Sequence, residues 1–357
     1  MGRFSVNVDA EDDLIRSFAK NARVGSNGPH IETPIRVGTK DVRETPVCEV
    51  YKEISSNKID LCLNDSQIER EYNATIRARL NCNDGVMNAF FLSYDDQRKP
   101  AKKQMTFLAD LQNVHSDILI TPSWTKYLNT IPGEEKTKQY LSLTEEFLDY
   151  SPPSGYKPYM GNIPTLIPNN DIEKVIKFYV ERGITSFVID SDGRVPWIDT
   201  WILNFYRTIG DKQYNIENEC LIYSINASTG RAKKNEMTYE AKDFIGFGAG
   251  FDIIGEKHVN KSFPHTQPTA NFNKRFNPGT YHYEKIPDTV SSRAEIKSEN
   301  VRTQIIEMGR VREILTDHDP LTKFLETKTI SEKTIKSLIN IKKDIRMVQS
   351  PLDRWFS

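Results

Sequence analysis

The chain has 357 residues, of which 38% are hydrophobic and 27% charged, and its formal net charge is -1. A chain of this length buries roughly three quarters of its unfolded surface, which predicts a globular protein of one large domain, with or without an appendage. The near balance of charges excludes a global basic field, so a nucleic-acid or membrane partner would require a local patch.

The cysteines and the N-terminal residues indicate the cellular compartment of the protein. The four cysteines lie far apart and form no C-x-x-C pair, which argues against a zinc knuckle, an iron–sulfur site and a disulfide scaffold. The start, MGRFSVNVDAEDD, lacks the basic and apolar regions of a signal peptide, and no apolar run approaches membrane-spanning length. We therefore expect a cytoplasmic protein with no metal, no cofactor and no membrane partner.

The portion up to about Arg98 is expected to be irregular. Within it, DGVMNAFFLSYDD predicts a strand, interpreted as an edge hairpin that caps the rest of the fold. From about Asp117 onward, strand-like and helix-like segments alternate, which favours parallel βα units.

The clearest such unit covers residues 159–206. It begins with a predicted buried strand, YMGNIPTLIP, and continues with a helix whose apolar face contains Ile172, Val175, Ile176, Tyr179 and Val180. Gly183 ends that helix, and ITSFVID is the next predicted strand. After SDGRVP, a second apolar helical face runs over residues 197–205.

A third strand, CLIYSINA, is followed by a short predicted helix around TYEAKDFI and by GFGAGFDIIGEKH, an apolar run that contains Asp252. Carboxylates are expected after strand carboxyl ends at Asp190, Asp192 and Asp252. This series predicts an α/β fold of the (β/α)₈ TIM-barrel type, in which chemistry gathers at the carboxyl-end rim. A doubly wound open sheet is the rival, although no G-x-G-x-x-G follows the first strand.

The pattern changes near residue 290. VRTQIIEMGRVREIL and SEKTIKSLINIKKDIRM are amphipathic, basic helical segments separated by TDHDPL. The expected organisation is a barrel domain over residues 1–290, including the N-terminal β segment, and a C-terminal helical extension over residues 291–357.

Two carboxylates end a predicted strand at VIDSDG. Because strand residues two apart point to the same side, Asp190 and Asp192 could repel one another and raise one pKa. This predicts a general acid and base, or a weak cation site. A turn that begins with Asp and ends in Gly explains the same residues.

Basic groups follow two of the predicted strands. Arg231, Lys233, Lys234, Lys257 and Lys261 would share a rim in a barrel and could bind a nucleic-acid backbone. Scattered lysines on solvated loops are the alternative.

Read in order, several stretches resemble the tRNA-guanine transglycosylase family of the queuine and archaeosine type, whose members exchange a purine base in nucleic acid for a 7-deazapurine. The similar stretches span roughly residues 22–258 and are ARVGSNGPHIETPIRVGTKDV, FLADLQNVHSDILITPSW, ERGITSFVIDSDGRVPWIDTWI and GAGFDIIGEKH. The last of these matches the family's G-V-D-x-F-D-C-V-x-P-T-R.

This resemblance implies that Asp252 is the nucleophile, which forms a covalent glycosyl-enzyme at C1′ of a nucleoside. A turn cap, or an ion pair with Lys257 or Lys261, is the other interpretation of Asp252. The resemblance also implies that substrate is bound by Asp190, Asp192, Ser123, Asn169 and His258. For Asn169, a helix cap is the competing assignment.

The chain departs from the family in four places. The C-x-C-x-x-C zinc motif is absent, and the position of the first-loop acid aligns near Pro122 or Ser123. IPNND replaces a Gln-Gly-Gly loop, and Asp190 and Ser191 replace the Gly-Gly of the next loop. The leading hypothesis is therefore a divergent glycosyltransferase acting on DNA or tRNA with a deazapurine base. A catalytically silent, nucleic-acid-binding barrel and an unrelated barrel hydrolase are the alternatives, and a homodimer or a heteromeric partner stays open.

Overall fold

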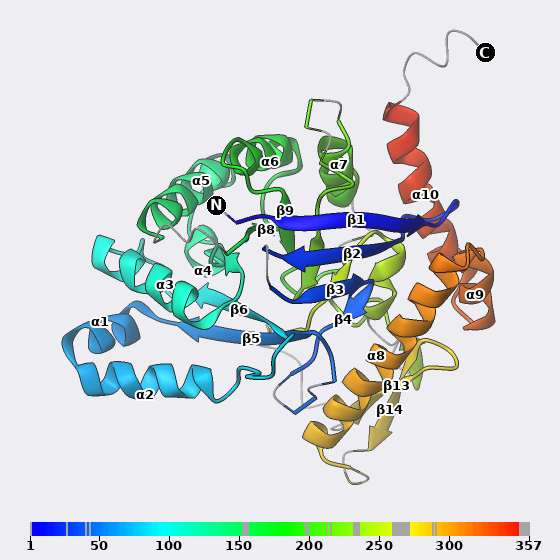
Figure 1. Cartoon of the computed structure of the whole chain (residues 1–357), viewed down its shortest axis with the longest axis horizontal. Helices are drawn as coiled ribbons and strands as arrows, with labels where there is room; N and C mark the ends of the chain where they lie inside the picture. The colour runs from blue at the N-terminus through cyan, green and yellow to red at the C-terminus, as the bar shows by residue number, and fades with distance from the viewer. Residues whose placement is uncertain are drawn as a thin grey trace.

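The structure is a mixed α/β fold in which parallel strands are surrounded by helices, with two small antiparallel sheets (Figure 1). This computed structural model describes residues 2–25, 28–39, 41–42, 44–151, 157–195, 197, 200–211, 213–214, 216–230, 236–258, 272–287, 289 and 291–349.

Six parallel strands form the largest sheet, in the spatial order β4, β12, β10, β9, β8, β7. Every residue of β8, β9 and β10 is buried, as expected for strands covered on both faces, and these three confirm strands predicted from the sequence. The bounds are β4 (Ile35–Arg36), β7 (Leu119–Ile120), β8 (Tyr159–Pro164), β9 (Ser186–Asp190), β10 (Ile222–Ile225) and β12 (Ile253–Ile254).

A second parallel sheet pairs β5 with β6 along their whole length. Two parallel bridges connect this pair to the larger sheet. Gly38, just after β4, bridges Cys48, and Ser93 bridges Ser123, just after β7. The carboxyl ends of both sheets therefore lie on the same side. The bounds are β5 (Val47–Ile54) and β6 (Met87–Tyr94).

Helices connect successive parallel strands and cover their outer faces. The predicted helix after β8 is confirmed as α6, and Ile172, Val175, Ile176 and Tyr179 form its buried face. The second predicted helix is confirmed as α7. The bounds are α1 (Ser56–Asn64), α2 (Ser66–Arg77), α3 (Lys102–His115), α4 (Thr125–Leu128), α5 (Gly133–Tyr150), the 3₁₀ turn η1 (Asn169–Asp171), α6 (Ile172–Glu181) and α7 (Thr200–Ile209).

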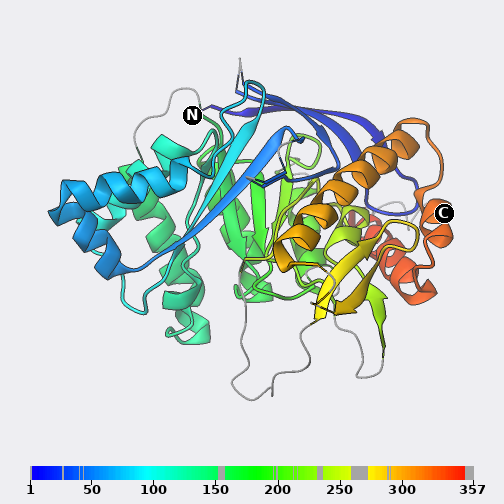
Figure 2. The ribbon, with the colours of Figure 1, turned by 90° about the horizontal axis from the view of Figure 1, so that it is seen from below.

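An antiparallel sheet of β1 (Phe4–Glu11), β2 (Phe18–Val24) and β3 (His30–Thr33) lies across the amino ends of the parallel strands (Figure 2). The expectation of an irregular N-terminal portion was wrong, because β1 to β6 are regular there. The strand expected around residues 87–94 is present, but its partner β5 is parallel, so it forms no edge hairpin.

A second antiparallel sheet lies beside the carboxyl ends. It has the order β11 (Thr238–Glu240), β14 (His282–Pro287), β13 (Phe272–Asn277). The helix predicted around TYEAKDFI is wrong: Tyr239 pairs with Tyr283 in this sheet, and a 3₁₀ turn, η2 (Phe244–Gly248), follows. Pairing with a distant strand overrides a helical pattern of only eight residues.

The two predicted C-terminal helices are confirmed as α8 (Arg293–Thr316) and α10 (Glu332–Gln349), and a short helix that was not predicted, α9 (Leu321–Thr327), lies between them. α8 begins with a capping box between Ser292 and Glu295 and packs on β13. No helix in the described ranges combines the length and apolar content needed to cross a bilayer.

Two buried clusters form the core. The larger lies mainly between strands and helices, and includes most of the buried faces of α3, α5, α6 and α7. The smaller draws on both parallel sheets and on β2 and β3. Its members are Ala22, Val24, Ile31, Ile35, Val37, Val47, Met87, Ala89, Phe91, Ile118, Ile120, Met160, Val188, Leu221, Tyr223, Ile225 and Ile253.

Candidate functional site at the carboxyl ends of the parallel strands

Asp190 is the last residue of β9 and is only 3% exposed. Its Oδ2 accepts a hydrogen bond from Ser123 Oγ at 3.3 Å, and its Oδ1 accepts from Asn226 Nδ2 at 2.9 Å and from the Asp192 N–H at 3.2 Å. Burial raises the pKa of Asp190 from its ordinary value, and the hydrogen bond from Asn226 opposes that shift. A carboxyl group in this environment is suited to hold a proton and release it.

The topology explains why these residues meet. Ser123 follows β7, Asp190 ends β9 and Asn226 follows β10, so all three lie where parallel strands end. Asp192 and Asn226 both have left-handed backbone, with φ of 45° and 58°. Asp and Asn adopt this region more readily than other non-glycine residues, so both positions suit the residues they hold.

Glu49, on β5, is the second buried acid at this end. Its Oε1 contacts His258 Nε2 at 2.6 Å, and its Oε2 accepts from Tyr223 Oη at 2.5 Å. Burial opposes ionisation of Glu49, but the hydrogen bond and charge of His258, together with the Tyr223 and Glu256 donors, lower its pKa overall. Glu49 is therefore a carboxylate, and it accepts the Nε2 proton of His258.

His258 connects the two acids. Its backbone N–H donates to Asn226 Oδ1 at 2.9 Å, while the Asn226 amide donates to Asp190. Its ring stacks on Tyr51, with centroids 4.5 Å apart and planes 3° apart. Burial raises the pKa of Tyr51, partly offset by hydrogen bonding to Ser93, and the Asp190 charge raises it further. The resulting set, here called the carboxyl-end cluster, consists of Glu49, Tyr51, Ser123, Asp190, Asn226 and His258.

Glu256, two residues before His258, borders this cluster. Its backbone oxygen accepts from the Asn226 N–H at 2.9 Å. Its carboxylate lies 2.6 Å from Lys297 Nζ and 3.8 Å from Arg36 Nη2. Two cations thus compensate this buried negative charge.

Asp252 is not part of the cluster. We expected it after a strand carboxyl end, and this is wrong, because it immediately precedes β12 and lies at the amino end. It is 2% exposed; its Oδ2 accepts from Lys20 Nζ at 3.0 Å and from the Ile222 N–H at 2.8 Å. Among the described residues, the ion-pair partner of Asp252 is therefore Lys20 on β2 and not Lys257, while Lys261 lies outside them. A side chain enclosed in this way has no path to the C1′ atom of a substrate.

The other predicted substrate residues divide into two groups. Ser123, Asp190 and His258 come together, and Asp192, two residues after Asp190, donates its backbone N–H to the Asp190 carboxylate. Asn169 instead lies in η1, where its Nδ2 donates to Thr200 Oγ1 at 2.8 Å. It does not cap α6, whose N-cap is Asp171.

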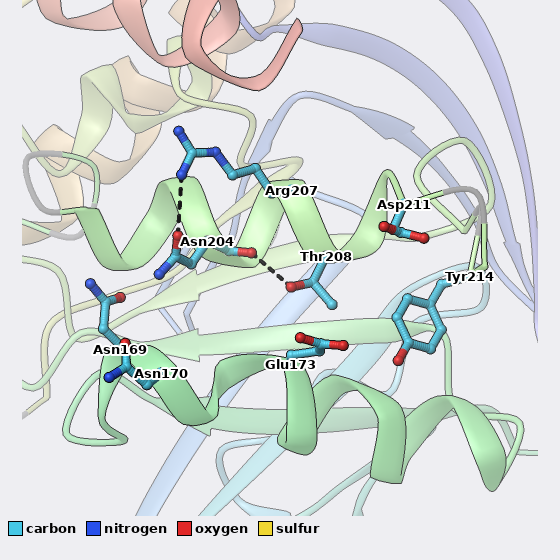
Figure 3. A pocket seen from close by; sticks show the side chains of 8 residues that line it. All are labelled: Asn169, Asn170, Glu173, Asn204, Arg207, Thr208, Asp211 and Tyr214. Atoms are coloured by element: carbon cyan, nitrogen blue, oxygen red, sulfur yellow. Dashed lines mark hydrogen bonds between the residues drawn. The ribbon is translucent and has the colours of Figure 1, made fainter. Parts of the chain in front are cut away.

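Asn169 lines a separate cavity of about 340 Å³ between α6 and α7 (Figure 3). Glu173 points into it from α6, and Asn204 and Thr208 border it from α7. This cavity lies between two helices, whereas the carboxyl-end cluster lies where the parallel strands end. Asn169 is therefore not part of that cluster.

Of the predicted backbone-binding residues, Lys257 is exposed beside Gly193, whose Cβ position would lie 3.9 Å from Lys257 Cε. This places Lys257 at the carboxyl ends, near Asp192. Arg231, Lys233, Lys234 and Lys261 lie outside the described residues.

Sequence reasoning missed Glu49, Tyr51 and Asn226. A signal existed for each. VCEVYKEI alternates, so Glu49 and Tyr51 share the inward face with Val47, and a glutamate on an inward face is unusual. Asn226 directly follows the strand IYSI, and Asp190 is the last residue of SFVID, which places both side chains at the carboxyl end of the sheet.

No protein-family model matches this chain, and no curated protein sequence matches it. Within the described residues, no three His, Cys, Asp or Glu side chains are arranged to hold a metal ion. What the chain does must therefore be inferred from the geometry of its own residues.

Proposed function

We propose that the two parallel sheets close into one eight-stranded β/α barrel. The order around the ring would be β4, β5, β6, β7, β8, β9, β10, β12, with Gly38–Cys48 and Ser93–Ser123 as the two joining bridges. The smaller buried cluster supports closure, because every one of these eight strands contributes a side chain to it. In such a barrel the carboxyl-end cluster would lie at the face that carries catalysis.

We further propose that the chain is a base transglycosylase that exchanges a purine-type base in DNA or tRNA for a deazapurine. The observation that carries this proposal is the pair of buried acids, Asp190 and Glu49, whose pKa values move in opposite directions within one hydrogen-bonded cluster. The protonated acid, Asp190, would supply the proton that the leaving base requires, and the ionised Glu49 would hold His258 in a fixed position beside it. The ordered resemblance of residues 22–258 supports the substrate class.

In this mechanism, protonated Asp190 gives its proton to a ring nitrogen of the leaving base as the C1′–N bond breaks. The Asp192 carboxylate attacks C1′ and forms an ester with the sugar. Asp190, now ionised, removes a proton from the incoming base. That base then attacks C1′ and releases Asp192. Glu49 keeps His258 and Tyr51 in place, and the ring pair forms a flat wall for a base.

The test is exchange of a labelled deazapurine into DNA and tRNA, followed by mapping of any trapped sugar adduct to a peptide. An adduct on the peptide with Asp192, lost in Asp192→Asn, supports the proposal. Asp190→Asn is expected to slow exchange by about 10²- to 10⁴-fold, the usual worth of a general acid. An adduct on Asp252, or no exchange with either polymer, would contradict it.

A second candidate is a nucleic-acid-binding subunit that does not exchange bases. The enclosure of Asp252 favours it, since the resemblance assigns the nucleophile to that residue. Such a protein would bind nucleic acid but show no base exchange. Asp190→Asn and Asp192→Asn would then leave every measured rate as it is in the unmodified chain.

A further inference from the structure

The hairpin of β13 and β14 brings two lysines directly opposite one another. Lys274 and Lys285 are register partners. Like charges at opposed positions destabilise a strand pair. Among the described residues, neither lysine has an acidic partner at ion-pair distance; Lys274 Nζ instead donates to Thr229 Oγ1 at 3.0 Å.

More cations surround this pair. Partial burial lowers the pKa of Lys274; Asp243 opposes the shift, and the charges of Lys257, Arg293 and Lys285 add to it. Lys257 and Arg293 are both exposed. Four positive side chains from four segments thus lie close enough to influence one another.

An aromatic side chain shares this face. Phe272 is two residues from Lys274 on β13, so both side chains point to the same side of the hairpin. It is 43% exposed, among the larger exposed apolar side chains of the described residues. A flat ring beside a group of cations is the combination with which proteins bind single-stranded nucleic acid, through stacking and phosphate contacts.

The face also adjoins the carboxyl-end cluster. Lys274 reaches Thr229, in the segment after β10, and Lys257 directly precedes His258. The hairpin lies at the same end as the carboxyl termini of the parallel strands (Figure 2). A polymer on this face would therefore pass beside the cluster.

We propose that Lys257, Phe272, Lys274, Lys285 and Arg293 form a strand-binding face that holds a single, unpaired nucleic-acid strand next to the carboxyl-end cluster. This inference rests on the proposed function for its choice of partner, because a base can enter a buried site only after leaving the stack. The lysines and the arginine contact phosphates, and Phe272 stacks on a base.

The test measures binding of labelled 12-residue single strands of DNA and RNA to the full chain over a range of salt concentrations. For the double variant Lys274→Gln/Lys285→Gln, we expect roughly tenfold weaker binding and a salt slope that is smaller by about 1.4, from about 0.7 for each lost phosphate contact. Phe272→Ala is expected to weaken binding about tenfold without changing the slope.

The matched control is Lys103→Gln/Lys138→Gln, which removes two exposed lysines on α3 and α5, far along the chain and across the fold from the hairpin. It should bind as the unmodified chain does. The proposal is overturned if both double variants bind alike, if a duplex binds better than the strand, or if polyglutamate competes as well as the strand.

A further arm separates this inference from the proposed function. Asp190→Asn leaves the strand-binding face intact, so it should retain full strand binding. Strand binding without any base exchange in the unmodified chain would contradict the proposed function alone. Exchange of a free nucleoside with no strand binding would contradict the strand-binding face alone.

Discussion

The side-chain amide of Asn226 donates to Asp190 Oδ1 at 2.9 Å, and its carbonyl accepts from the His258 N–H at the same distance. Asn226 thereby fixes two parts of the site. It binds Asp190, whose pKa is raised, and it binds the backbone of His258, whose ring contacts Glu49. Asn226 is fully buried and has left-handed backbone, so its orientation is set on both sides.

Asn226→Asp is expected to disrupt this link while keeping the shape of the side chain. The new carboxylate still accepts from the His258 N–H, but it donates nothing to Asp190 and opposes the ionisation of that residue. We expect a loss of about 2 kcal/mol in the free energy of unfolding and loss of any exchange activity. Chemical denaturation checks the first effect. Since Asp also tolerates left-handed backbone, an unchanged stability would mean that the Asn226 donor contributes little.

We expect Asp190→Asn to change stability in a way that depends on pH. Compared with the unmodified chain, the variant should be relatively more stable at neutral pH than at acidic pH. The folded-state pKa of Asp190 is raised above 3.8, so its stabilising proton is present at low pH and is lost as the pH rises through the folded value. Asparagine carries no such charge at any pH. Unfolding measured from pH 3 to pH 8 checks this. A difference between the two proteins that is independent of pH would contradict it.

Glu49→Gln is expected to give the opposite pH dependence. The folded-state pKa of Glu49 is lowered from 4.5, so its contribution to stability is present above the unfolded value and is lost as the pH falls through the folded value. At pH 7 we expect a cost of about 1–3 kcal/mol, because a hydrogen-bonded buried charge is removed. The cost should shrink at acidic pH, and a cost that grew there would show that Glu49 is neutral in the fold.

Lys20→Met is expected to cost about 3–5 kcal/mol, since it leaves the Asp252 carboxylate buried without its partner. The double variant Lys20→Met/Asp252→Asn should recover much of that loss, because no buried charge remains. Thermal and chemical denaturation of the single and double variants form a double-mutant cycle. Additive losses would mean that the two side chains do not interact.

Gly255→Ala is expected to disturb the Glu49 carboxylate and the strand beside it. A Cβ at residue 255 would lie 2.4 Å from Glu49 Oε2 and 2.7 Å from both the Ser224 backbone oxygen and Tyr223 Cε2, so all three contacts must shift. We expect a loss of about 1–3 kcal/mol. Gly309→Ala in α8 is the control, since nothing lies within 4 Å of its Cβ position and alanine favours the helix. Equal effects of the two changes would exclude a role for the close approach at residue 255.

The spacing of apolar residues was sufficient to predict the elements whose buried faces follow a local sequence pattern. β8, β9, β10, α6 and α7 were predictable because their apolar residues repeat with strand or helix spacing. The strand pairing of Tyr239 with Tyr283 was not, since its stability comes from a segment more than 40 residues away.

For the site, the predictable part was the position of Asp190. VIDSDG places an acid directly after apolar strand residues. Such an acid must lie at the carboxyl end of the strand. Asp252 misled because a short apolar run does not reveal where the strand begins, and β12 starts one residue after it. A shift of one or two residues moves an acid from one end of a strand to the other.

By itself, the sequence determined an α/β chain with parallel strands, basic C-terminal helices and an acid at residue 190, because these depend on residue type and local spacing. Only the tertiary structure decided that Glu49, Asn226 and His258 join Asp190, and that Lys20 encloses Asp252. Glu49 and His258 are separated by 209 positions, and their contact depends on how distant strands align, which no local pattern encodes.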